Sequence, residues 1–315
     1  MLFHDLLNLD DTPLHVIERS FSDQSRCELT EQYLSEIVQS KTQFDCAIQI
    51  TDQNQDELTG IALLMNSEGE DFWAIFSNVI RKNPGWNDLA IELCERVNDL
   101  RVVAIENSRF MDAITEYYSL MLVNRMLCDR CMHEKKSFGE IFSESRVERL
   151  LPLLTATEQS EKIDFKEMDL LEICCGNGMA TIALRAAGCD PLCLDSDQCA
   201  VCEGLEHGVL APHRSMVLDA TLSTRFFAAG SFDCVVGFML GAIYPFNRDL
   251  WEKIMRESAT VLRHGGVLLV TVHKNEEIVI LKEILDGLGI SGEIIDNRDD
   301  AGLYDQWVYL GEKVV

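Results

Sequence analysis

The chain has 315 residues, which is more than one domain of typical size requires and enough for two. Apolar residues make up 47% and charged residues 25%, a composition that supports a sizeable buried core and excludes wholesale disorder. The formal net charge of −26 would repel a phosphate backbone, so nucleic acid is not an expected partner. We find no signal segment at Met1 and no apolar run approaching membrane-helix length, so we expect a soluble cytoplasmic protein without membrane association and with its twelve cysteines reduced.

The first part of the chain predicts a small α+β domain. Apolar residues recur there at helical spacing in some stretches and form strand-like runs in others. We expect helices at 29–38, 88–99 and 108–127, and strands at 44–51, 58–65 and 73–80. The aromatic stripe of the last helix is typical of core packing, although its members could instead line a substrate pocket.

A polar segment at 128–137 separates this part from a further helical pattern at 138–154. We place the domain boundary there, which gives an N-terminal domain of residues 1–137 and a C-terminal domain of residues 138–315. Cys128, Cys131 and His133 lie in this segment and could supply three zinc ligands, but a fourth ligand is not evident nearby. We therefore expect ordinary cysteines here and no metal site.

From residue 169 onward, short apolar runs alternate with helical stretches. This rhythm predicts an α/β fold, in which a parallel sheet is covered by helices. The expected strands are 170–174, 192–195, 215–218, 234–238 and 267–272, and the expected helices are 179–187, 198–204, 250–262 and 276–288.

The run LLEICCGNGMATIAL, at 170–184, places a strand, a glycine-containing turn and a helix start in immediate succession. Gly176 and Gly178 remove side chains where a backbone must approach a ligand closely, and the helix N-terminus presents unpaired N–H groups. Asp195 ends the next strand, 17 residues after Gly178, where its carboxylate can accept both hydroxyls of a ribose. We include its neighbour Ser196 in the site, and the pattern predicts a pocket for a nucleoside cofactor.

Three features favour S-adenosylmethionine over a nicotinamide dinucleotide. Thr181 replaces the third glycine of the full dinucleotide fingerprint. Asp219 ends the third strand, where an acidic side chain can accept the adenine amino group. The chain closes with two strand-like runs, at 293–296 and 306–311, separated by a short turn-rich segment.

With these features, residues 170–313 resemble the class I S-adenosylmethionine-dependent methyltransferases. The resemblance implies a Rossmann-like, doubly wound and mostly parallel seven-stranded sheet, with a terminal hairpin that inserts an antiparallel strand. In that family the first motif reads acidic-x-Gly-x-Gly-x-Gly, and this chain has Glu172, Cys174, Gly176 and Gly178 at those positions. The first glycine is therefore replaced by Cys174, which leaves open a modified cofactor site.

The resemblance also implies roles for individual residues. Glu172 would anchor the turn or the amino group of the cofactor, Asp195 would bind the ribose, and Asp219 with Ala220 would border the adenine. Phe238, at the far end of the fourth strand, would face the transferred methyl group.

Methyl transfer from a sulfonium requires in-line alignment and exclusion of water rather than a metal. The N-terminal domain and the loop after Phe238 are the expected lid and specificity elements. We expect Tyr244, after the fourth strand, to line the acceptor pocket and His273, after the fifth, to accept a proton.

The leading interpretation is a methyltransferase of a small molecule, and the runner-up acts on a protein or peptide side chain. The chain lacks the Asn-Pro-Pro-aromatic run of enzymes that methylate planar amide or base nitrogens, which weakens a DNA or glutamine substrate. A third hypothesis, motivated by Cys174, is a regulatory protein that binds the cofactor without catalysis, and a dehydrogenase is the least favoured. The oligomeric state stays open.

Overall fold

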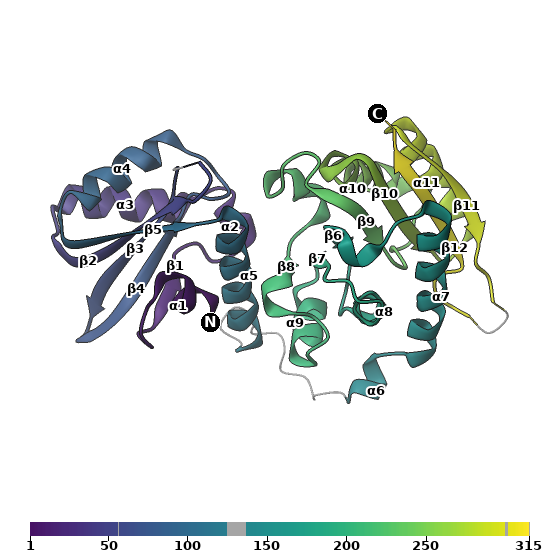
Figure 1. The fold of residues 1–315 in the computed structure, drawn as a ribbon, viewed down its shortest axis with the longest axis horizontal. Helices are drawn as coiled ribbons and strands as arrows, with labels where there is room; N and C mark the ends of the chain where they lie inside the picture. Colours follow the sequence, from purple (N-terminus) through teal and green to yellow (C-terminus); the bar gives the residue numbers. More distant parts are fainter. Residues whose placement is uncertain (56, 125–136, 300–301, 315) are drawn as a thin grey trace. The chain divides into compact units, whose positions relative to one another are not determined.

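A computed structural model of the chain describes residues 1–55, 57–124, 137–299 and 302–314. The chain divides into two compact units, Met1–Leu127 and Cys128–Val315. Each unit has its own sheet and its own hydrophobic core (Figure 1).

The N-terminal unit contains a mixed five-stranded sheet in the order β1-β4-β3-β2-β5. Strands β2, β3 and β4 form an antiparallel meander, while β1 pairs in parallel with β4 and β5 in parallel with β2. The strands are β1 (Leu14–Val16), β2 (Phe44–Asp52), β3 (Leu58–Ser67), β4 (Glu70–Ser77) and β5 (Val97–Ile105). The helices are α1 (Leu2–Leu7), α2 (Phe21–Gln24), α3 (Glu28–Ser40), α4 (Pro84–Cys94) and α5 (Asn107–Val123).

Buried side chains explain why this unit folds. Leu34 of α3 and Trp86 of α4 belong to one core with Ile61 and Phe76 of the sheet, and each of these four residues is almost fully buried. Helices α1 and α5 meet through Phe3 and Phe110, whose rings pack edge to face at 5.8 Å.

The structure corrects two sequence predictions in this unit. The helix expected at 88–99 begins at Pro84 and ends at Cys94, and its last residues belong instead to β5. The expected strand at 73–80 ends at Ser77. Strand β5 lies at the edge of the sheet and leaves most of its side chains partly or fully exposed, so its sequence lacks the apolar alternation of a half-buried strand.

The C-terminal unit contains a seven-stranded sheet in the order β11-β12-β10-β9-β6-β7-β8. All neighbours are parallel except β12, which lies antiparallel between β10 and β11. The strands are β6 (Leu170–Ile173), β7 (Leu192–Asp195), β8 (Ser215–Val217), β9 (Phe232–Gly237), β10 (Leu262–Val272), β11 (Ile290–Asp296) and β12 (Trp307–Lys313). This order confirms the doubly wound, mostly parallel sheet with an antiparallel terminal hairpin.

Helices cover this sheet (Figure 1). They are α6 (Phe138–Ile141), α7 (Glu144–Glu161), α8 (Met179–Ala186), α9 (Gln198–Glu206), α10 (Arg248–Val261) and α11 (Asn275–Gly287), with short 3-10 turns η1 (Phe165–Glu167), η2 (Pro212–Arg214), η3 (Ala220–Arg225) and η4 (Pro245–Asn247). The helical stretch expected at 138–154 is thus two helices with a break at Phe142 and Ser143. Helices α7 and α8 share one core with β6, β9, β10 and β12.

The strand order reverses beside β6, because β7 follows it on one side and β9 lies on the other. Right-handed crossovers in opposite directions leave a crevice beyond the carboxyl ends of these strands, where ligands bind in open α/β sheets. The loops after β6 and β9 therefore meet at the position predicted for the cofactor. Among the described helices, none has the length and apolar character needed to span a bilayer.

Candidate functional site

The loop between β6 and α8 is a tight turn held by its own backbone. The N–H of Gly178 donates to the carbonyl of Cys175 at 2.9 Å, and the N–H of Cys175 donates to the carbonyl of Leu194 on β7 at 3.2 Å. Gly178 has φ +84°, and a Cβ placed on it would lie 2.7 Å from Leu210 and 2.8 Å from Val209, so both backbone conformation and space favour glycine there. Gly176 has φ +57°, but no atom of the described residues lies within 4 Å of its hypothetical Cβ. The peptide at Gly176 is therefore open to a ligand.

Cys174 takes the left-handed conformation of the glycine that it replaces. Its φ is +53°, in a region that costs an L-residue on the order of 1–2 kcal/mol. Burial raises the pKa of its thiol to about 12, and the carboxylates of Asp195 and Asp219 add to the increase. The side chain is thus a small neutral group, and the turn keeps the backbone shape of the family motif.

Glu172 is a buried carboxyl group on β6, with 1% of its surface exposed. Its Oε2 accepts a hydrogen bond of 2.6 Å from Oγ1 of Thr181, which ties α8 to the strand. Among the described residues, none donates to its Oε1, which is buried. Burial raises the pKa of Glu172 to about 7, although hydrogen bonds from Thr181 and Cys193 oppose that rise.

The carboxylate of Asp195 ends β7 beside the same loop. Its Oδ2 accepts from the N–H of Gly176 at 2.8 Å, and its Oδ1 accepts from the N–H of Asp197 at 2.7 Å. Both oxygens are thereby fixed in orientation, and each retains acceptor capacity for a hydroxyl group. Ser196, next to it, is exposed.

Asp219 and Ala220 follow β8, at the same edge of the sheet. The Oδ1 of Asp219 accepts from the N–H of Thr221 at 2.8 Å and so caps η3. The Asp219 side chain is exposed, whereas Ala220 is 6% exposed. Because Oδ1 of Asp219 is engaged in the cap, Oδ2 is the oxygen that could accept a hydrogen bond from a ligand.

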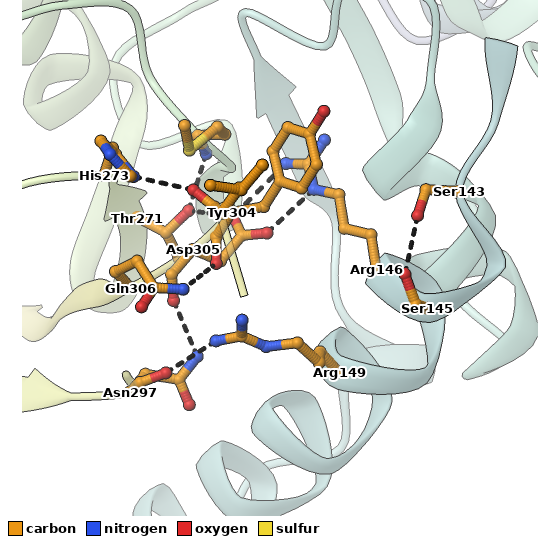
Figure 2. A network of polar contacts seen from close by, with 12 residues as sticks. Ser143, Ser145, Arg146, Arg149, Thr271, His273, Asn297, Tyr304, Asp305 and Gln306 are labelled. Atoms are coloured by element: carbon orange, nitrogen blue, oxygen red, sulfur yellow. Dashed lines mark hydrogen bonds and ion pairs between the residues drawn. The ribbon is translucent and has the colours of Figure 1, made fainter. Parts of the chain in front are cut away.

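A buried polar network surrounds Thr271 and Asp305 at the carboxyl end of β10 (Figure 2). The Oγ1 of Thr271 donates to Asp305 at 2.5 Å and accepts from the backbone N–H of Met239 at 2.7 Å. The Nε of Arg146 donates to Asp305 at 2.9 Å, and the two side chains are 8% and 1% exposed. The network joins α7, β10 and the connection before β12 to Met239, the residue after the buried Phe238.

Tyr244 and His273 lie in the loops that follow β9 and β10. The Tyr244 ring stacks on Phe246 at 5.3 Å and lies 5.8 Å from Nζ of Lys274, the residue after His273. The Nδ1 of His273 is 2.7 Å from the carbonyl oxygen of Leu303. A carbonyl only accepts, so Nδ1 carries the hydrogen and Nε2 of the neutral ring is a basic nitrogen.

A pocket of about 420 Å³ opens beside the buried network. Its walls come from the first turns of α7 and from the connection between β11 and β12. The lining includes Arg146, Arg149, Leu303 and Tyr304. This volume is within the range typical of sites for small molecules, roughly 300–1,000 Å³.

The cysteine and histidine residues considered as zinc ligands, Cys128, Cys131 and His133, lie outside the described residues. Within the described ranges, no group of three histidine, cysteine, aspartate or glutamate side chains has an arrangement that could hold a metal ion.

Residues 170–266, which contain the cofactor loop and strands β6 to β9, match the family model described as a methyltransferase domain. This match identifies a methyltransferase domain within the C-terminal unit, whose sheet has the order expected for the class I fold. A methyltransferase domain transfers methyl groups, and the cofactor predicted for it from the sequence is S-adenosylmethionine.

Several solved structures resemble the chain at low sequence identity. A protein from Pyrococcus horikoshii is 17% identical, with a TM-score of 0.43, over 57% of this chain and 93% of its own. Magnesium protoporphyrin IX methyltransferase from Synechocystis, solved with bound S-adenosylmethionine, is 15% identical, with a TM-score of 0.42, over 64% of this chain and 96% of its own. N-methyltransferase NodS from Bradyrhizobium japonicum is 18% identical, with a TM-score of 0.40, over 55% of this chain and 99% of its own. No curated protein sequence matches the chain.

The residues around the loop of the methyltransferase domain fit this cofactor. The buried Oε1 of Glu172, which accepts from none of the described donors, suits a cationic amino group. The open peptide at Gly176 suits close approach of a ligand, and the oriented carboxylate of Asp195 suits ribose hydroxyls.

Sequence reasoning missed the polar network of the methyltransferase domain. Arg146 and Asp305 are separated by 159 residues, and both have the appearance of ordinary surface charges in the sequence. Only the fold brings Arg146, Thr271 and Asp305 together, so local spacing could not have identified them.

Proposed function

We propose that this methyltransferase transfers the methyl group to a small-molecule acceptor. The observation that carries the proposal is the pocket of about 420 Å³, which lies at the same edge of the sheet as the cofactor loop. A folded polypeptide acceptor would be expected to use a broad surface rather than such a pocket.

The proposed cofactor site consists of residues from the ends of four neighbouring strands. They are Glu172, Cys174, Gly176, Gly178, Asp195, Ser196, Asp219, Ala220 and Phe238. Bound S-adenosylmethionine supplies an electrophilic methyl group on a sulfonium. In this proposal Glu172 holds the amino group, Asp195 and Ser196 bind the ribose, and Asp219 and Ala220 border the adenine.

The protein's task is then to position the acceptor and to exclude water. Phe238 provides an apolar wall near the methyl group, and Tyr244 lines the acceptor side. His273 accepts a proton at Nε2 when the acceptor atom is protonated, because its Nδ1 is held by Leu303. We propose that residues 1–137 act as a lid or substrate domain. Cytoplasmic location remains a prediction from composition.

A peptide acceptor is the second candidate, and one feature favours it. Phe246 is 85% exposed and stacks on Tyr244 in the loop after β9, with Leu250 also exposed. An exposed apolar cluster of this kind is typical of surfaces that bind other chains.

Formation of S-adenosylhomocysteine tests the proposal on the full chain. Calorimetric titration with S-adenosylmethionine and S-adenosylhomocysteine establishes binding first. Product formation is then followed with a panel of small molecules and, separately, with a peptide library, using Asp195→Ala as the control that cannot bind cofactor. Turnover with small molecules supports the proposal, whereas turnover confined to peptides favours the second candidate.

His273→Gln gives an independent check on the proton acceptor. We expect its turnover to be lowered most for acceptors that must lose a proton, with cofactor affinity unchanged. Equal loss for acceptors with and without an ionisable proton would contradict this role.

A further inference from the structure

We propose that strand β5 of the N-terminal unit is an interaction surface that pairs with the same strand of a second copy of this chain. The two strands would lie antiparallel about a two-fold axis at Leu100, so that the two five-stranded sheets become one continuous sheet. The inference concerns the N-terminal unit and does not depend on the proposed acceptor.

Strand β5 presents a backbone edge that is available for pairing. It is the last strand of its sheet in the described part of the chain, and it runs for nine residues beside β2. The carbonyl of Ile105 accepts from the N–H of Gln53, directly after β2, at 3.1 Å, so the backbone polar groups of Ile105 point toward β2. Because these directions alternate along a strand, the N–H and C=O groups of Leu100 and Val102 point away from β2, toward the open edge. Such an edge is a template for another strand.

Apolar side chains lie along this edge on the face of the sheet that α3 and α4 cover. Leu100 pairs in register with Ala47, which belongs to the core beneath these helices, so Leu100 and Val102 lie on that face. They are nonetheless 37% and 62% exposed. Antiparallel pairing about Leu100 would place each Leu100 opposite its copy, with Val102 on the diagonal, and so would remove apolar surface from water.

Charged side chains on the other face select the register. Asp99 and Arg101 share that face, since both act on the thiol of Cys46, the partner of Asp99 on β2. Asp99 is exposed and Arg101 is half-buried. Pairing about Leu100 would set each Asp99 directly opposite Arg101 of the other copy, at positions where facing Cα atoms approach to about 4.5 Å. A shift of the axis by one residue in either direction would set like charges opposite each other, and a shift by two residues would remove both ion pairs. The strand is therefore complementary to itself in one register.

The test measures the mass of the full chain by sedimentation velocity, with a thiol reductant present, as the protein concentration rises from about 1 to about 200 µM. Salt at about 0.15 M screens the net charge of −26 beyond about 8 Å. Wild-type protein should shift from the mass of one chain to that of two. Arg101→Asp and Asp99→Arg should each weaken association about tenfold or more, because each sets like charges opposite each other twice. Arg248→Asp makes the same change in net charge at an exposed arginine of the C-terminal unit, and this matched control should keep the wild-type association.

An equimolar mixture of the Asp99→Arg and Arg101→Asp proteins tests the register itself. In a mixed dimer the two substituted residues face each other with opposite charges, and the native Arg101 of one chain faces the native Asp99 of the other. Fluorescently labelled Asp99→Arg protein should therefore bind the Arg101→Asp protein about as tightly as wild type binds itself, a rescue that misfolded variants could not give. The proposal would be overturned by a wild-type protein that stays monomeric, by association that neither substitution weakens, by equal weakening in Arg248→Asp, or by a mixture that associates no more tightly than its components.

Discussion

Removing one partner of the buried pair of Arg146 and Asp305 should cost far more stability than removing one partner of an exposed pair of similar length. Asp305→Leu leaves the guanidinium of Arg146, which is 8% exposed, without its carboxylate, and it also removes the acceptor of Thr271. Removing one partner of a buried pair typically costs about 3–5 kcal/mol, because the other charge stays buried. The exposed pair of Arg248 and Glu283, at 2.7 Å compared with 2.9 Å for the buried pair, should contribute about 0–1 kcal/mol.

Urea unfolding of protein labelled with 5-fluorotryptophan measures both costs. Trp251 and Trp307 lie in the C-terminal unit and report its unfolding separately from the tryptophans of the N-terminal unit. We expect Asp305→Leu to lower the free energy of unfolding by about 3 kcal/mol or more, and Glu283→Leu by less than about 1 kcal/mol. The double variant Arg146→Met with Asp305→Leu should recover much of the loss, since no charge is left buried. Equal costs for Asp305→Leu and Glu283→Leu would refute the reasoning.

Three further predictions concern the cofactor loop. Asp195→Ala should abolish measurable binding of S-adenosylmethionine in calorimetry, and wild-type affinity would disprove the assigned site. Cys174→Gly should raise the free energy of unfolding by about 1 kcal/mol at most and retain cofactor binding, because glycine tolerates φ +53° without strain; a clear loss of stability in urea would contradict this. Glu172 has a pKa raised from 4.5 to about 7 in the folded protein, so its contribution to stability is full below about pH 4.5 and is lost as pH rises through 7. Over that pH window, the free energy of unfolding of the wild-type protein should fall by about 3 kcal/mol relative to that of Glu172→Gln. Parallel curves of the free energy of unfolding against pH for the two proteins would contradict the raised pKa of Glu172.

The parts of the fold that could be predicted from sequence are those that depend on neighbouring residues. Strand β6, its turn and α8 are contiguous in the sequence, so the positions of Glu172, Gly176 and Gly178 could be predicted from one continuous segment. Asp195 was located because parallel strands all end at one edge of the sheet, which fixes where the residue after β7 must lie. The doubly wound, mostly parallel seven-stranded sheet with an antiparallel terminal hairpin followed from the family resemblance, and the structure confirms it.

The features that could not be predicted depend on pairing across long distances. Strand β5 exists because its backbone pairs with β2, whereas its side chains leave little apolar pattern. Asp305 lies in a polar, turn-rich stretch that is typical of a solvated loop, yet it is 1% exposed. A charge in such a stretch carries no local sign of its burial, because the partner that permits burial is Arg146 on a distant helix.

Arg146 is hydrogen-bonded to Asp305, and its charge also acts on Glu172, the proposed anchor of the cofactor amino group. A substitution at Asp305 should therefore change the pKa of Glu172. The positive charge of Arg146 lowers the pKa of Glu172, which burial otherwise raises to about 7. Asp305 offsets that charge, because it lies within hydrogen-bonding distance of the same guanidinium. Asp305→Leu should therefore leave the charge of Arg146 unopposed and lower the pKa of Glu172. Carbon-detected NMR titration of the Glu172 carboxyl measures this directly. An unchanged pKa in the variant would show that the two ends of the network are electrostatically independent, and a higher pKa would contradict the predicted direction.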